Sequence, residues 1–176
     1  IKYANYFYSR NYSAPNYPGS GGTNPGDWCS SSYDNLWTGN SSRIKTVYDP
    51  SPVGYKVPDP AAFYGFCEVT GSSTDKTQWI YDGTAMSVMK GYNFTPNSVS
   101  LFFPAAGFRS YADYESDGIE YMEGNINRLG LNAYFWTNTP NTDPRYGNAL
   151  GFSSSYVSTH SAYVKADGLP VRPVTE

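Results

Sequence analysis

Apolar positions in this chain come in short runs, which turn-forming residues separate. The strongest run is Val99–Phe103, which is rich in β-favouring residues and stops at Pro104. Tyr134–Thr137 is the second. Short, continuously apolar runs are typical of strands that are covered on both faces. We therefore predict that both segments are central, buried strands.

Weaker extended segments surround these two. Residues 1–10 predict an opening strand, and Trp79–Met89 predicts two strands joined by a turn. Further short extended pieces are expected at Thr46–Tyr48, Tyr55–Val57, Ala149–Phe152, Tyr156–Val157, Ala162–Val164 and Leu169–Val174. The last of these contains two prolines, which exclude a helix and place it at a sheet edge or a sheet end.

One segment has the features of a helix start. Asp59 is suited to cap the first turn, and Pro60 is suited to the first helical position. Ala61 and Ala62 favour helix. Gly65 is expected to end the helix within two turns.

Polar segments separate the predicted elements. Residues 11–27 and 138–147 are rich in turn-forming residues and predict surface loops, and residues 109–130 are polar and irregular. The pattern as a whole predicts one α+β domain over residues 1–176. We expect mixed short β-sheets, one or two short helices, long irregular loops and more strand than helix.

Composition agrees with a turn-rich globular protein and narrows the class of partner. The chain has 176 residues, and aromatic residues make up 18%, which supplies apolar area for one core. The net charge of −3 argues against nucleic acid and anionic membranes, because both require a basic surface. No apolar run approaches the ~18 residues of a membrane span. The start at Ile1, without a signal peptide, indicates a mature form or an excised domain.

Residues suited to metal binding or covalent catalysis are few. Cys29 and Cys67 lack Cys-x-x-Cys spacing, and they form either a disulfide or two packed thiols. His160 is the only histidine, and its Ser and Thr neighbours are merely local, so we interpret it as a solvated loop residue. We expect no transition metal, no cofactor and no catalytic residue.

An acidic stretch raises the alternative of a calcium site, since calcium takes oxygen ligands from carboxylates. The stretch consists of Asp113, Glu115, Asp117, Glu120 and Glu123. It lacks the turn glycine and the final glutamate of an EF-hand. A solvated acidic loop is therefore the preferred interpretation.

The loop at residues 138–148 is the best candidate for a ligand surface, and the 109–130 segment is the one expected to join it. Its candidate ligand-binding residues are Asn138, Asn141, Asp143, Arg145 and Tyr146. They combine hydrogen-bonding groups, a forked donor and an aromatic face, a mixture that suits the hydroxyl edges and C–H faces of a sugar. The predicted strands on either side give the loop a fixed frame. The alternative is an ordinary hydrophilic connection.

Two arginines beside apolar strands, Arg109 and Arg172, are expected to be structural. A guanidinium group in such a position can donate hydrogen bonds to loop carbonyls. The four tryptophans are expected to pack in or near the core.

Five segments occur in an order and spacing that resemble one family. They are Asp27–Trp37, Lys45–Pro58, Leu101–Arg109, Tyr134–Pro140 and Gly168–Val174. Together they resemble the Fibrobacter succinogenes major paralogous domain family. The resemblance implies a C-type-lectin-like fold and a place in Bacteroidetes surface and fimbria-associated proteins. Relatives usually carry a cysteine where this chain has Ser51. If the resemblance implies that this cysteine pairs with the position of Cys29, that bridge is absent here, and Cys67 would be the one possible replacement.

The working hypothesis is a non-enzymatic adhesion module, extracellular or attached to the outer membrane. It would bind a glycan or a host surface protein and adjoin other surface or fimbrial domains of the same protein. The alternatives are a structural domain without a ligand, a receptor diversified by a retroelement, and an enzyme like the formylglycine-generating oxidases. The enzyme rests on likeness of fold alone, because no motif here matches its reactive cysteines.

Overall fold

The computed structural model describes part of the chain. The described residues are 37–39, 44–66, 72–73, 91–94, 99–111, 114–116, 118–121, 124–143, 145–153 and 156–176. The strands predicted at residues 1–10 and 79–89, the loop at 11–27, and both cysteines lie outside them. So do Asp113, Asp117 and Glu123 of the acidic stretch.

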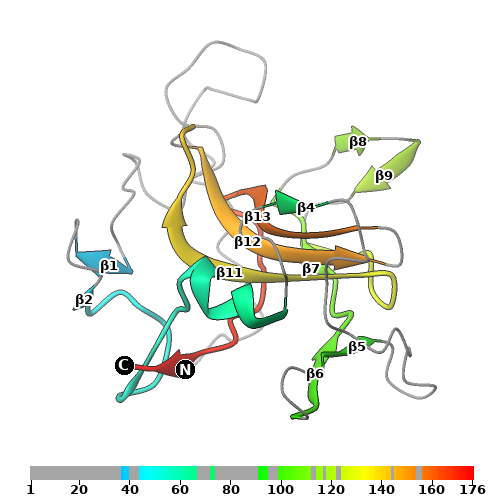
Figure 1. Cartoon of the computed structure of the whole chain (residues 1–176). Coiled ribbons are helices and arrows are strands. Elements are labelled where there is room, and N and C mark those ends of the chain that lie inside the picture. Colours follow the sequence, from blue (N-terminus) through cyan, green and yellow to red (C-terminus); the bar gives the residue numbers. More distant parts are fainter. Residues whose placement is uncertain are drawn as a thin grey trace, which may run out of the picture.

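A four-stranded antiparallel sheet forms the centre of the fold (Figure 1). Its order is β11 (Asn132–Pro140), β12 (Tyr146–Ser153), β13 (Val157–Val164) and β4 (Ser72–Ser73). The register places Trp136 opposite Ala149, and it shifts at a bulge between Trp136 and Pro140. The two closing strands predicted within residues 156–164 are therefore one strand, β13.

Short antiparallel ribbons surround this sheet (Figure 1). Each pairs two strands of two to four residues. They are β1 (Thr38–Gly39) with β2 (Ile44–Lys45), β3 (Tyr55–Lys56) with β14 (Val174–Thr175), β5 (Gly91–Phe94) with β6 (Leu101–Pro104), β7 (Phe108–Arg109) with β10 (Ile126–Asn127), and β8 (Tyr114–Ser116) with β9 (Ile119–Tyr121). The predicted irregular segment at 109–130 therefore contains paired strands.

The predicted α+β class is wrong, and so is the C-type-lectin-like fold that came with it. Among the described residues the sole helical element is the 3-10 helix η2 (Pro60–Phe66), whereas strands dominate. Asp59 does cap this element, because its Oδ1 accepts a hydrogen bond from the Ala61 N–H at 2.9 Å. Side chains three apart eclipse in a 3-10 helix, and Gly65 disfavours propagation, so the element stays short.

Strand β11 is buried on both faces from Asn132 to Asn138. Because side chains alternate along a strand, it contributes to two clusters. Ala133 and Phe135 pack with Phe63 of η2 and with Phe103, Leu150, Phe152 and Val157. Tyr134 and Trp136 pack on the other face with Val57, Phe108, Ala149 and Leu169. The burial predicted for Tyr134–Thr137 is confirmed, but the predicted central position is wrong, because β11 is at one end of the four-stranded sheet.

The outer edge of β11 is closed by irregular backbone. The N–H of Trp136 donates to the carbonyl of Pro170 at 3.0 Å, and the N–H of Asn138 donates to that of Pro58 at 2.8 Å. Proline has no N–H, so each of these residues can accept from the strand without offering a donor for further pairing. The predicted edge position of the proline-containing C-terminal segment is confirmed at Pro170.

The prediction for Val99–Phe103 is correct only in part. The strand is β6, which pairs with β5 alone among the described strands, and Val99 is 57% exposed. Phe103 is 1% exposed and meets the Phe135 ring edge-on at 5.3 Å. Val99 precedes β6, and Leu101, Phe102 and Pro104 are only partly buried, so an apolar run did not mean burial on both faces.

Thr46–Tyr48, predicted as a strand, is a β-turn in which the Asp49 N–H donates to the Thr46 carbonyl at 3.2 Å.

The inward-facing ammonium group of Lys45 holds the backbone of this region. Lys45 Nζ donates to three backbone oxygens and lies 3.7 Å from Asp49 Oδ1. The three acceptors are the carbonyl oxygens of Ser51 at 2.6 Å, Pro52 at 2.9 Å, and Tyr55.

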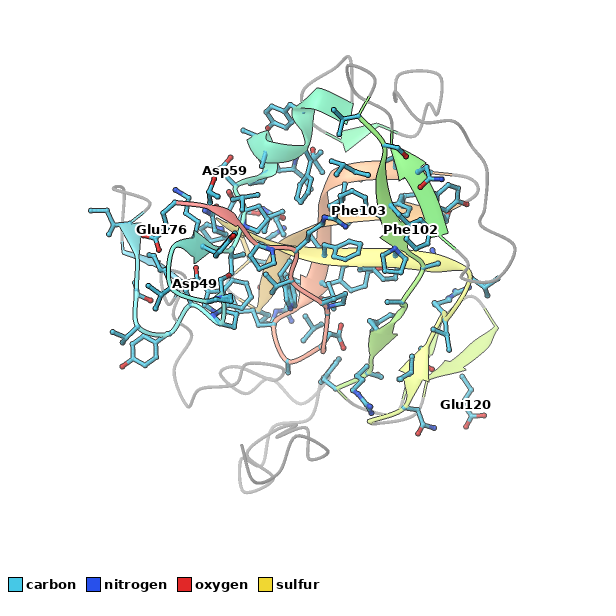
Figure 2. The ribbon with its side chains drawn as sticks, turned by 90° about the horizontal axis from the view of Figure 1, so that it is seen from below. Asp49, Asp59, Phe102, Phe103, Glu120 and Glu176 are labelled. Atoms are coloured by element: carbon cyan, nitrogen blue, oxygen red, sulfur yellow. The ribbon has the colours of Figure 1, made fainter. Side chains whose placement is uncertain are left out.

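Asp49 completes this arrangement from the buried side (Figure 2). Its carboxylate accepts hydrogen bonds from the N–H groups of Ser51 at 2.7 Å and Val57 at 2.9 Å. The Lys45 ammonium thus bonds to backbone carbonyls of this region, and the Asp49 carboxylate bonds to its backbone N–H groups.

Replacing Phe103 with alanine should lower the free energy of unfolding by about 3–5 kcal/mol, because it empties a closed aromatic site. Val99→Ala is the matched control in the same segment and should change stability by less than about 0.5 kcal/mol. Urea unfolding of both variants measures the difference. Equal effects would mean that Phe103 is not in the core.

Ser51→Ala should raise the free energy of unfolding by about 1 kcal/mol. The Ser51 hydroxyl is buried and has no hydrogen-bond partner within the described part of the chain. Ser153 is similarly buried, but its hydroxyl accepts from the Tyr156 N–H at 3.3 Å, so Ser153→Ala should destabilise. The two melting temperatures should shift in opposite directions, and a loss of stability in both variants would contradict the assignment.

Candidate functional site

The turn between β11 and β12 is held by its own side chains. Asn141 Nδ2 donates to Asn148 Oδ1 at 2.9 Å, and Asn148 Nδ2 donates to the Pro140 carbonyl at 3.0 Å. Asn141 Oδ1 accepts from the Asp143 N–H at 3.1 Å. Asparagine bonds of this kind fix a turn that would otherwise be mobile. In the described residues of the predicted loop, these hydrogen bonds tie the end of β11 to the start of β12.

The exposed tip of this turn carries a paired carboxylate and guanidinium. Arg145 Nε lies 3.0 Å from Asp143 Oδ1, and Arg145 Nη2 lies 2.5 Å from Asp143 Oδ2. The hydrogen bond from Arg145 lowers the pKa of Asp143 to about 2, and Asp143 raises the pKa of Arg145. Both side chains remain substantially exposed, at 49% for Arg145 and 36% for Asp143. The pair is thus a preformed, planar hydrogen-bonding surface.

An aromatic face lies beside the pair. The Arg145 guanidinium carbon is 5.6 Å from the centre of the Tyr146 ring, within the range of a cation–π contact. Tyr146 is the first residue of β12, and its N–H donates to the Asp143 carbonyl at 3.0 Å. The ring and the charged pair are therefore held by the same short piece of backbone.

Four of the five predicted site residues lie together at this turn, and Asn138 does not. Its side chain is buried, and Asn138 Nδ2 donates to the Val57 carbonyl at 3.3 Å. With its N–H on Pro58, the residue joins β11 to the segment before η2. Asn138 has a structural position rather than one on the exposed tip.

Three residues at this end of the sheet were missed from the sequence. The Lys165 N–H donates to the Arg145 carbonyl at 3.0 Å, and the Lys165 charge helps to lower the pKa of Asp143. Tyr111 interacts electrostatically with Arg145, and its N–H donates to Asp167 Oδ1 at 3.1 Å. No sequence motif identifies these three residues. Their contacts join Tyr111 to Asp167 and Arg145 to Lys165, and these pairs meet only because β13 lies beside β12 in the fold. Tyr111 belongs to the 109–130 segment, which was expected to join the ligand surface, and that expectation stays a prediction.

Asp167 is a buried carboxyl group beneath this surface. It is 2% exposed, and burial raises its pKa to about 7, against the opposing effect of the Tyr111 N–H. Its own N–H donates to the Val164 carbonyl at 2.9 Å. Asp167 thus ties Tyr111 to the turn that follows β13.

A group of three tyrosines lies between β11 and β13, and of these Tyr134 is buried while Tyr156 and Tyr163 are partly buried. The rings of Tyr134 and Tyr163 are 4.5 Å apart, and both hydroxyls interact with that of Tyr156. Burial raises the pKa of Tyr134 and of Tyr163. The Tyr134 and Tyr163 hydroxyls therefore stay protonated, and their contacts with each other and with Tyr156 make the group part of the packing.

The remaining predicted residues have structural surroundings. Arg109 Nη1 donates to the Gly124 carbonyl at 2.7 Å, and Arg172 Nη1 donates to the Phe102 carbonyl at 2.7 Å, so the predicted role of both arginines is confirmed. Arg172 also stacks over the Phe103 ring at 4.3 Å, and burial lowers its pKa. His160 is in β13 rather than in a loop, with Nδ1 2.9 Å from Thr159 Oγ1.

Within the described ranges, no group of three or more His, Cys, Asp or Glu side chains could hold a metal ion. In the acidic stretch, Glu115 and Glu120 take opposite register positions in the β8–β9 ribbon. In the same residues, no helix is both long enough and apolar enough to span a membrane.

Comparison of the chain with protein-family models gives no match, and neither the curated proteins nor the solved structures give one. The family resemblance therefore stays a prediction that rests on its five segments.

Asp167→Asn should remove a pH dependence of stability between about pH 4 and pH 7. Because the folded state raises the pKa of Asp167, the native protein holds a proton that the unfolded chain has lost in this range. Stability therefore falls as the pH rises through it, by up to about 4 kcal/mol, and is flat above. Asparagine keeps the acceptor for Tyr111 and carries no charge.

Urea unfolding at pH 5, 6, 7 and 8 tests this expectation. The wild type should weaken with rising pH and Asp167→Asn should not. Asp143→Asn is the control. The pKa of Asp143 is lowered, so its effect on stability is confined to pH values below about 4 and has the opposite sign. This variant should therefore weaken with rising pH between pH 5 and pH 8 as the wild type does. A wild-type stability that is constant from pH 5 to pH 8 would rule out the protonated Asp167.

Proposed function

We propose that this chain is a non-enzymatic binding module, displayed outside a Bacteroidetes-type cell, that binds a carbohydrate through the β11–β12 turn. The observation that carries the proposal is the Asp143–Arg145 pair held beside the Tyr146 ring on a rigid, exposed turn. Display outside the cell is supported only by the family resemblance of the sequence.

The chemistry of a sugar suits such a surface. Each ring presents hydroxyl groups at its edge, which both donate and accept hydrogen bonds, and C–H groups on a face. The outer oxygens of Asp143 can accept, and the free guanidinium N–H groups of Arg145 can donate. The Tyr146 ring, with Tyr111 nearby, offers an apolar face on which a sugar ring can stack.

The hydrogen bonds within the β11–β12 turn keep the entropic cost of ligand binding low. The side chains of Asn141 and Asn148 make three hydrogen bonds in the turn, and the Tyr146 N–H makes a fourth to the Asp143 carbonyl. Because these bonds already hold the turn, little conformational freedom is lost when a ligand binds. An open, exposed site still binds weakly, at about millimolar for one domain, and multivalent display raises the avidity. Weak single sites of this kind fit adhesion to a glycan-coated surface or a host surface protein.

A structural role without a ligand is the remaining alternative, and adjoining domains of the same surface protein would be its partners. The oxidase alternative has lost its basis, because the likeness of fold on which it rested is overturned. The carbohydrate proposal rests on the turn alone and is independent of the fold class.

The test is a glycan array followed by titration of any glycan bound. The variant Arg145→Ala with Tyr146→Ala should lose binding by tenfold or more, while circular dichroism shows an unchanged fold. Tyr146→Phe keeps the ring and should bind as well as the wild type. Arg145→Lys keeps the charge but not the fork, and should bind more weakly.

Two outcomes would refute the proposal. One is a folded double variant that binds its glycan as tightly as the wild type does. The other is a multivalent, correctly folded wild type that binds no glycan on a broad array, which would favour the structural alternative.

A further inference from the structure

Residues 44–55 form a lobe in which charged side chains face inward and apolar side chains face outward. Lys45 and Asp49 are its two charged residues, with side chains 17% and 0% exposed, and they are held in the bonds to the turn backbone. The outward-facing side chains are those of Ile44, Val47, Tyr48, Val53 and Tyr55. We name these five the lobe patch. Folded proteins normally distribute charge the other way round.

The most exposed members of the lobe patch are at the corners of two β-turns. Val47 and Tyr48 are the central residues of the turn closed by the Asp49 N–H and the Thr46 carbonyl. Val53 is a central residue of the next turn, in which the Tyr55 N–H donates to the Pro52 carbonyl at 3.0 Å. Val47 is 93% exposed and Val53 is 97% exposed.

Valine is poorly suited to these corners. Gly, Pro, Asn, Asp and Ser dominate turn positions, and stiff β-branched side chains favour strands. Gly54, with φ of 82°, meets the backbone requirement of the second turn, so Val53 is not needed for its shape. Neither valine stabilises the fold through burial. Their exposure leaves apolar surface available for a contact that the described residues do not make.

The lobe patch is rigid before any partner arrives. The ammonium of Lys45 bonds to the carbonyls of Ser51, Pro52 and Tyr55, and so fixes the second turn to the strand that precedes the first. β14 then pairs with β3, and the Glu176 N–H donates to the Gly54 carbonyl at 3.2 Å. Asp49 and Glu176 lie at this end of the molecule in Figure 2. Ordered apolar surface loses little entropy on binding.

We infer that the lobe patch is the centre of an interface between two copies of this chain, related by a two-fold axis. The five side chains present on the order of 500 Å² of apolar surface. A standard interface buries about 800 Å² on each partner, with an apolar, charge-poor and aromatic-rich centre. The lobe patch supplies most of that area and has that composition.

Charge favours a second copy as the occupant. A two-fold axis brings each surface against itself, so a charged patch would repel its own copy. The chain carries a net charge of −3, which opposes self-association through acidic faces, whereas the lobe patch carries no outward charge. An uncharged apolar surface is complementary to itself.

The test is analytical ultracentrifugation of the whole chain at a series of concentrations. The wild type should dimerise with a dissociation constant of about micromolar order. Val47→Asp with Val53→Asp should raise that constant by more than a hundredfold, since four carboxylates would meet in the dimer. Aspartate suits turn corners, so the fold should survive.

The matched control is Leu129→Asp with Leu131→Asp, which places the same charges at exposed leucines in the connection between β10 and β11. This variant should dimerise like the wild type. If the aspartate variant proves unfolded by circular dichroism, Val47→Ser with Val53→Ser should still raise the constant at least tenfold. Hydrogen exchange at residues 46–55 should slow as the wild-type concentration rises.

The inference is overturned by a wild type that stays monomeric at several hundred micromolar. That includes a monomer whose lobe amides are protected at every concentration, which would mean that another part of the same chain covers the lobe patch. It is equally overturned if the lobe variant and the leucine control dimerise alike. These results are independent of glycan binding at the β11–β12 turn.

Discussion

The fold depends on one strand, β11, which is buried on both faces and along its outer edge. Its side chains divide between an aromatic cluster around Phe103 and Phe152 and a second cluster around Phe108 and Leu169. At its outer edge, the N–H groups of Trp136 and Asn138 donate to the carbonyls of Pro170 and Pro58. Segments that are distant in sequence are thereby fixed to one another. The strands of the surrounding ribbons are only two to four residues long. Such short ribbons are not stable alone, and packing around β11 stabilises them.

β11 also determines where the exposed turn points. β11 continues past its bulge to Pro140 and returns as β12, so the rigidity of the sheet extends to within a few residues of Arg145. The polar residues of the turn bond to one another rather than to the core. The core and the proposed ligand surface therefore make separate demands on the sequence, and the turn residues can change without altering the packing.

Sequence patterns predicted the parts that local chemistry determines. β11 was recognisable because four adjacent aromatic or β-favouring residues have few alternatives to burial. The structural role of the two arginines followed from their place beside apolar segments, although their acceptors are 15 residues away for Arg109 and 70 residues away for Arg172. The helix start at Asp59 was real, but propensity could not foresee that packing of Phe63 against the sheet would favour a single short 3-10 element. Asn138 was assigned to the ligand surface by its polar neighbours, whereas its acceptor is 81 residues away in sequence. Thr46–Tyr48 has strand composition, but it is a turn closed by the Asp49 N–H and the Thr46 carbonyl, and the bonds of Lys45 to later carbonyls hold the chain that follows.

That lysine has a consequence for how the protein responds to its medium. Many extracellular loops fold their carbonyl oxygens around a calcium ion, and their shape then varies with the calcium supply. Here the cation is an ammonium group attached to the chain itself. Dilution or a chelator cannot remove it, and the local shape should not depend on the ionic composition of the medium. Amine-modifying reagents, which abolish that charge covalently, are the agents to which this loop is sensitive.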